Sequence, residues 1–265
     1  MRDHTRRWGR LGLIIAITSA VMCADPETTI QTDEAHHDEA SNAQSETQIR
    51  YHLTWDWGEA AATEGGWAVV NDRGYTVEVT DGYLVTHSVQ MAPCTDADLG
   101  VDTTLSRLFG AGRAWAGHGG VDDPSAWLTG MAESLAHPEP TALGPIAVNS
   151  GLYCRSHYLV ARAEPGMLGL PESMDLVGVS LYIEGTAALD EPLPFAVLST
   201  LPTGSLMGWT DPVSPIALTG GDIDVTITRD LGRLFDGVDF ATMSDDAIQK
   251  TVLLGLAERV RVRVE

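Results

Sequence analysis

The histidines beyond position 50 are the residues whose types and spacing could do chemistry. In the strand predicted over 83–91, His87 shares one face with Val85, Val89 and Met91. An imidazole together with a thioether is a ligand pair that suits copper, so His87 and Met91 are candidate metal ligands. A histidine on an apolar face is also often an ordinary core residue, and that alternative remains open for His87.

A second candidate ligand, His118, lies between glycines in the stretch Trp115-Ala116-Gly117-His118-Gly119-Gly120. Glycines let the backbone approach closely and leave the imidazole unobstructed. Packing does not readily explain a histidine in this setting, and both a ligand and a plain loop residue remain open. His157 is a further candidate ligand, although the alternation around it leaves its facing undecided.

The chain lacks the common motifs of hydrolases, nucleotide-binding proteins and zinc proteases. It contains no Gly-x-Ser-x-Gly, no phosphate-binding loop, no His-Glu-x-x-His and no Gly-x-Gly-x-x-Gly. Its paired acids, Asp122-Asp123 and Asp245-Asp246, are sequence neighbours, and neighbours on a strand point to opposite faces. We therefore expect a protein that is not an enzyme.

The amino terminus has the form of a secretion signal. Four arginines and one aspartate occupy residues 1–10, and an uncharged apolar stretch runs from Leu11 to Met22. This stretch is shorter than the about 20 apolar residues that span a bilayer. Ala20-Val21-Met22-Cys23 resembles a lipoprotein signal, which predicts lipidation of Cys23. Ordinary signal-peptidase cleavage near Cys23 or Ala24 is the alternative.

Residues 24–49 are polar and acidic, with little apolar content. Such a segment cannot bury enough surface to offset the entropy of ordering, so we expect a disordered tether. A signal over 1–23 followed by this tether predicts a protein exported to the periplasm or the outer membrane and cell surface, held by a lipid anchor.

The formal net charge of −21 bears on the class of partner. Nucleic-acid binding needs a basic surface that releases counterions from phosphates, so this charge argues against nucleic acid. Strong acidity instead favours solubility or the attraction of cations.

Two cysteines, Cys94 and Cys154, remain once Cys23 is set aside. An even pair in an exported protein most often forms a disulfide. Closing a loop of about 60 residues would stabilise the fold by roughly 2–4 kcal/mol. Thiolate ligation of a metal is the alternative.

Alternating apolar residues after position 49 predict an all-β domain over 50–265. Asp81-Gly82 predicts a hairpin, and the region from Leu105 to Pro145 predicts a long loop-rich insertion. Ser244-Asp245-Asp246 predicts a helix start with a capping hydroxyl. The fold class that follows is an antiparallel β-sandwich with a C-terminal helix and then a final strand. The alternation predicts strands over 50–57, 74–79, 83–91, 153–162, 176–184, 195–200, 222–228 and 259–264.

Four stretches carry a resemblance to a known family, namely Asn71–Val79, Tyr83–Met91, Gly151–Tyr158 and Asp230–Phe240. They resemble the corresponding stretches of MbnP-like proteins. The resemblance implies an exported β-sandwich that binds copper, with His87 and His118 as ligands and Trp115 nearby. From their residue types and positions, Met91 or His157 is expected to assist as a further ligand. It also implies a di-haem MauG-like oxidase as a partner, an enzyme that can oxidise a tryptophan near the metal. A surface binding or adhesion module without metal is the alternative function.

Overall fold

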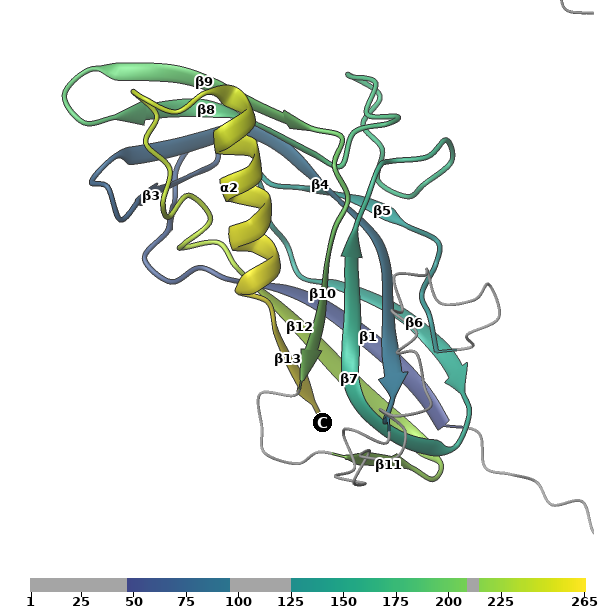
Figure 1. Cartoon of the computed structure of the whole chain (residues 1–265). Coiled ribbons are helices and arrows are strands. Elements are labelled where there is room, and N and C mark those ends of the chain that lie inside the picture. Colours follow the sequence, from purple (N-terminus) through teal and green to yellow (C-terminus); the bar gives the residue numbers. More distant parts are fainter. Residues whose placement is uncertain (1–46, 96–124, 209–214) are drawn as a thin grey trace, which may run out of the picture. The chain divides into compact units, whose positions relative to one another are not determined.

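The computed structural model describes residues 47–95, 125–208 and 215–265 of the chain. In this part the fold is a sandwich-like arrangement of two sheets followed by one helix and a last strand, which confirms the predicted fold class (Figure 1). The smaller sheet, sheet A, has four strands, and the larger one, sheet B, has nine.

Sheet A joins segments from both ends of the folded chain. Its order is β13–β12–β1–β6, and its central pair, β1 and β12, runs parallel over ten residues, from Thr47 opposite Gly221 to Asp56 opposite Asp230. The other two pairs are antiparallel. The strands are β1 (Thr47–Asp56), β6 (Thr141–Val148), β12 (Gly221–Asp230) and β13 (Arg261–Val264).

Sheet B is built around the long strand β4, which pairs with β3, β5, β7 and β8. All of its strand pairs are antiparallel. The strands are β2 (Ala61–Ala62), β3 (Trp67–Val70), β4 (Thr76–Pro93), β5 (Met131–Ser134), β7 (Gly151–Val160), β8 (Leu181–Ala188), β9 (Pro192–Ser199), β10 (Thr203–Gly208) and β11 (Ile216–Leu218).

The core lies between the sheets and is filled by alternate residues of their strands. Ile49, Tyr51 and Leu53 of β1 and Val225 and Ile227 of β12 are fully buried, as the alternation predicts. Sheet B and the helix α2 (Asp245–Glu258) contribute further apolar side chains to the same cluster, and α2 packs against β9 and β10 (Figure 1).

The helix begins where the sequence predicts, but its capping differs. Ser244 stands at the N-cap with extended backbone, and Asp245 and Asp246 occupy the first turn. The Ser244 hydroxyl makes no capping hydrogen bond, so that expectation was wrong; the Ser244 carbonyl accepts from Ala247 and Ile248 instead. Across the described ranges, no helix is long and apolar enough to cross a membrane.

The predicted hairpin at Asp81-Gly82 does not form, because β4 runs straight through these residues. A two-residue hairpin of this type needs positive φ, and Gly82 is not among the glycines with positive φ. The glycine instead allows close approach of β8, since a Cβ at Gly82 would lie 2.8 Å from the carbonyl oxygen of Tyr182. The Asp-Gly pair thus marks a close approach of the paired strands β4 and β8 rather than a turn.

The predicted insertion over 105–145 contains two strands, β5 and most of β6. Strand β6 lies at the edge of sheet A and exposes many of its residues, so it lacks the apolar alternation by which strands were recognised. The predicted strand over 176–184 begins later, at Leu181, because Leu176 packs in a separate cluster on the other side of sheet B.

Candidate functional site

Strand β4 carries the predicted ligand His87 and contains three irregularities in its pairing, the last of them between Ala92 and Pro93 at the end of the strand. Its register shifts against β8 between Val79 and Asp81, and against β7 between Thr86 and Ser88. An extra residue in one strand reverses which side chains face inward beyond it. The core-facing side chains of β4 accordingly change from odd to even positions and back to odd. The members in the main core are Val77, Val79, Leu84, Val89 and Met91.

The predicted common face of Val85, His87, Val89 and Met91 is therefore wrong. Val89 and Met91 belong to the core between the sheets, whereas Val85 packs in a second cluster with Leu176 and its neighbours. His87 is the extra residue of the second bulge and is half-buried. A rule of strict alternation cannot predict this arrangement. The bulge changes the pairing of the strands but leaves no break in the pattern of apolar and polar residues.

The ring of His87 has a nitrogen available for a ligand. Its Nδ1 atom is buried and has no hydrogen-bond partner in the part of the chain that the structure describes. A neutral imidazole nitrogen is the commonest metal ligand in proteins, and buried polar atoms are rarely left without a partner. The bulge thus presents an imidazole nitrogen whose binding capacity is unused by the described residues.

Met91 and His157, the two predicted assisting ligands, lie on opposite faces of sheet B. Met91 is fully buried in the core. His157 stands between Ser156 and Tyr158, which are buried toward the core, so its side chain takes the other face. Its ring lies beside Gly204 of β10. A single ion cannot be held by Met91 and His157 together.

The other predicted residues lie outside the described ranges: His118, Trp115 and Cys23. The described ends of the segment that carries His118 are both attached to β4. Cys94 follows the last residue of the strand and donates its backbone N–H to the Leu152 carbonyl at 2.9 Å. At the other end, Trp127 exchanges two backbone hydrogen bonds with Val89, at 2.7 and 3.2 Å.

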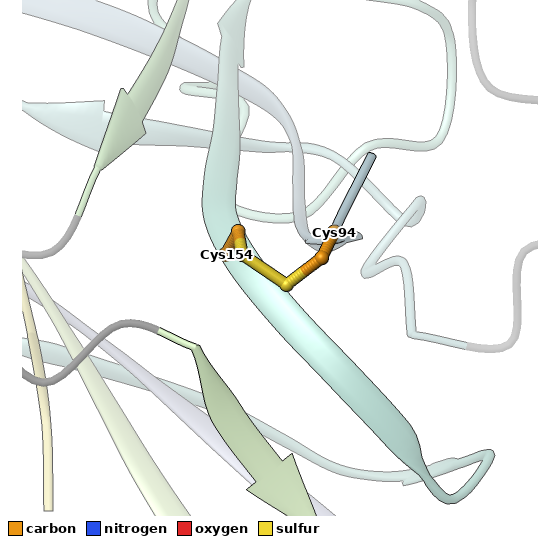
Figure 2. Close-up of a disulfide and its surroundings, with 2 residues drawn as sticks. All are labelled: Cys94 and Cys154. Atoms are coloured by element: carbon orange, nitrogen blue, oxygen red, sulfur yellow. A yellow bond between two sulfur atoms is a disulfide. The ribbon is translucent and has the colours of Figure 1, made fainter. Parts of the chain in front are cut away.

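The predicted disulfide joins Cys94 to Cys154 of β7, as Figure 2 shows. The two residues are 60 positions apart, and their Cα atoms lie 4.8 Å from one another. The bond holds the end of β4 against the first half of β7. It also occupies both thiols, which leaves neither Cys94 nor Cys154 as a thiolate ligand.

Metal-ligand clusters of the usual kind do not occur within the described ranges. Three or more histidine, cysteine, aspartate or glutamate side chains never converge there in a metal-binding group. His87 is thus an isolated candidate among the described residues.

A buried polar network crosses the core close to His87. The Arg229 guanidinium on β12 donates through Nη1 to Oε1 of Glu133 on β5, at 2.6 Å, with the two side chains 0% and 5% exposed. Thr86, the residue before His87, donates its hydroxyl to the same Oε1 at 2.6 Å. The Tyr158 hydroxyl lies 3.0 Å from that of Thr86 and accepts from Arg229 at 3.4 Å. The network links both sheets.

The charges of Arg229 and Glu133 stabilise one another. Burial disfavours the charged form of Arg229, but the negative charge of Glu133 outweighs this and raises the pKa of Arg229. Burial also raises the pKa of Tyr158, which keeps its hydroxyl protonated. The guanidinium carbon lies 4.0 Å from the centroid of the Trp55 ring, a cation–π contact. The network is therefore a neutral tyrosine beside one compensated ion pair.

Sequence reasoning did not find this network. Arg229 follows Val225 and Ile227 at core-facing positions of β12, and a charged residue in such a series was the available signal. Glu133 gave no comparable signal, because β5 fell inside the region predicted as loops.

A hollow of about 520 Å³ lies at the carboxyl ends of β1 and β12. Five acidic side chains and one arginine line it. Asp56 is paired with Arg261, and Asp236 with Arg233 and Arg259, so part of its acidity is already compensated. The charged lining residues are Asp56, Glu59, Asp72, Asp230, Asp236 and Arg233.

In comparisons with known proteins, no family model, no curated protein and no solved structure matches the chain. The function is therefore argued from the geometry of the site.

Proposed function

We propose that this chain is an exported, non-enzymatic protein of the cell envelope that binds copper, with His87 as a ligand. The observation that carries the proposal is the buried Nδ1 atom of His87, which has no hydrogen-bond partner within the described ranges. A bulge sets this side chain apart from the regular faces of the sheet. Bulges commonly re-aim a side chain toward a functional site.

His118 is the proposed second ligand. The segment that carries it returns to β4 at Trp127, whose partner Val89 is two residues from His87. The chain from His118 to Trp127 can span up to about 30 Å, so its length allows His118 to reach the bulge. Because Met91 and His157 lie on opposite faces, the proposed site recruits at most one of them.

Several features together support the proposed location in the cell envelope. A disulfide is stable in an oxidising compartment and fits the export predicted from the amino terminus. The net charge of −21 favours cations over anions. The resemblance to MbnP-like proteins adds a di-haem MauG-like oxidase as the proposed partner.

Metal analysis tests this function. Protein purified from its native envelope in chelator-free buffer is expected to hold about one copper per chain. In competition titrations, His87→Ala and His118→Ala are each expected to weaken copper binding at least about 10–100-fold, since loss of even a residue that only orients a ligand typically costs that much. His137→Ala is the matched control, since His137 is exposed and should leave affinity unchanged. Absence of copper, or unchanged affinity in both variants, would refute the proposal.

The second candidate is a binding or adhesion module without metal. The hollow beside Asp56 and Asp230 favours it, since about 520 Å³ falls within the range of ligand pockets. The same metal analysis separates the two functions. The module is supported if the purified protein holds no copper and if His87→Ala and His118→Ala leave its copper affinity unchanged.

A further inference from the structure

The buried ion pair between Arg229 and Glu133 leaves one polar atom of each side chain without a partner, although Arg229 Nε donates to the Thr54 carbonyl and Glu133 Oε1 accepts from both Arg229 and Thr86. Nη1 and Oε1 are joined, but Arg229 Nη2 and Glu133 Oε2 are buried without a hydrogen-bond partner among the described residues. Leaving a buried donor or acceptor unpaired costs about 1–3 kcal/mol, and more for charged groups. One unused donor and one unused acceptor thus stand on the two members of one pair.

The Trp55 indole adds a second unused donor to this cluster. Its Nε1 atom is also buried without a partner in the described ranges, and its ring lies 4.0 Å from the Arg229 guanidinium carbon. Trp55 is 8% exposed, so bulk water does not serve this group freely. The cluster therefore offers two N–H donors and one carboxylate oxygen as acceptor.

The hydroxyls of the network bond the other two atoms of the ion pair. Thr86 donates to Oε1 of Glu133, and the Tyr158 hydroxyl bonds Thr86 and Nη1 of Arg229. Neither hydroxyl reaches Nη2 or Oε2 within hydrogen-bond distance, since these two atoms have no partner in the described part of the chain. Completing the network requires a further group.

Charge and size define that group. Arg229 and Glu133 compensate one another, so the site has no excess charge to hold a cation or an anion. The ligand must accept from N–H groups and donate to a carboxylate, and it must fit between side chains that are 0% and 5% exposed. Water meets these requirements, and buried water typically makes two to four such bonds.

We propose that the core of this protein holds an ordered water molecule bound between Arg229 Nη2 and Glu133 Oε2, with Trp55 Nε1 as a further donor. This water joins sheet A, which carries Trp55 and Arg229, to sheet B, which carries Glu133. Since the site is enclosed, the water exchanges with solvent only when the sheets open locally. The site is independent of the copper proposal, because neither His87 nor His118 takes part.

A crystal structure of the full chain at high resolution is the first test. We expect density for a water within about 2.7–3.2 Å of both Nη2 and Oε2. Direct bonds from both atoms to protein groups, for instance from residues 96–124 or 209–214, would overturn the proposal. An ion or an organic molecule in place of water would overturn it as well.

Magnetic relaxation dispersion of water ¹⁷O gives an independent count of long-lived internal waters. The double variant Arg229→Met with Glu133→Leu replaces the pair by apolar side chains of similar volume, a change that folded proteins often tolerate. We expect this variant to lose at least one long-lived water. The matched control is Arg50→Met with Asp222→Leu, an exposed pair that should leave the count unchanged. Equal counts in wild-type protein and the buried double variant would refute the site; if that variant does not fold, the crystal structure decides.

Discussion

Strand β12 forms ion pairs on both of its faces, and the two faces have opposite environments. Toward the core, Arg229 meets Glu133 with both side chains almost fully buried. Toward the outside, Asp222 meets Arg50 at 2.7 Å, with side chains 59% and 45% exposed. His52 lies beside Asp224 on the same outer face, at 2.9 Å. The pairs share their chemistry and differ in their access to water.

This difference decides what each pair contributes. Exposed ion pairs add little to the free energy of unfolding, because water solvates the separated charges nearly as well as the charges solvate one another. A buried pair loses that solvation, so each charge depends on its partner and on further hydrogen bonds. The inner pair has such bonds with Thr86 and Tyr158 and a cation–π contact with Trp55, whereas the outer pairs are exposed to solvent. The inner face thus specifies how the sheets align, and the outer face remains tolerant.

The largest expected effect comes from removing one charge of the inner pair. Glu133→Ala leaves Arg229 charged, buried and uncompensated, and should lower the free energy of unfolding by about 3–5 kcal/mol. Urea denaturation followed by tryptophan fluorescence measures this loss. Asp222→Ala on the outer face is the control and should cost less than about 1 kcal/mol. Similar losses in the two variants would contradict the comparison.

A smaller effect is expected from the threonine hydroxyls of the two faces. Thr86→Val removes a hydrogen bond to the Glu133 carboxylate and should cost about 1.5–3 kcal/mol, the range for bonds to charged groups. Thr54→Val removes the outer bond to Thr228, which joins two neutral hydroxyls at 3.1 Å, and should cost about 0.5–1.5 kcal/mol. Unfolding in urea compares them. A Thr54→Val loss equal to that of Thr86→Val would argue against a special role for the inner network.

The smallest expected effect is a pH dependence of the outer face. The Arg261 side chain bonds Asp56, and this bond together with the Gly58 N–H lowers the Asp56 pKa from its ordinary value of 3.8. A lowered pKa stabilises the fold above pH 3.8, and this stabilisation is lost as the pH falls through the folded-state pKa. Asp56→Asn should flatten the acid side of the stability curve below pH 3.8. An unchanged slope in this variant would show that the exposed pair contributes nothing measurable.

Much of the fold could be predicted from local patterns. The alternation of β1 and β12, the helix after Ser244 and the strand that follows it depend on side chains a few positions apart. The Cys94–Cys154 disulfide followed from the number of cysteines. The strands and the helix could be predicted because burial of one face makes apolar residues recur at a fixed spacing along the sequence.

The candidate site was predictable only in part. His87 and Met91 were named from their types and spacing, but the bulge between Thr86 and Ser88 separates them from the face on which they were placed. Glu133 and Arg229 are 96 positions apart, and neither carries a local sign of the other. The position of His118 lies outside the described residues.

The sequence by itself thus determined the class of fold, the disulfide and the order of the final helix and strand, since each depends on composition or short-range period. Only the tertiary structure decided that Asp81-Gly82 continues a strand, that β1 and β12 run parallel, and that Met91 and His157 face apart. The physical reason is that strand pairing brings distant residues together. One extra residue in that pairing reverses every face beyond it while leaving the sequence pattern intact.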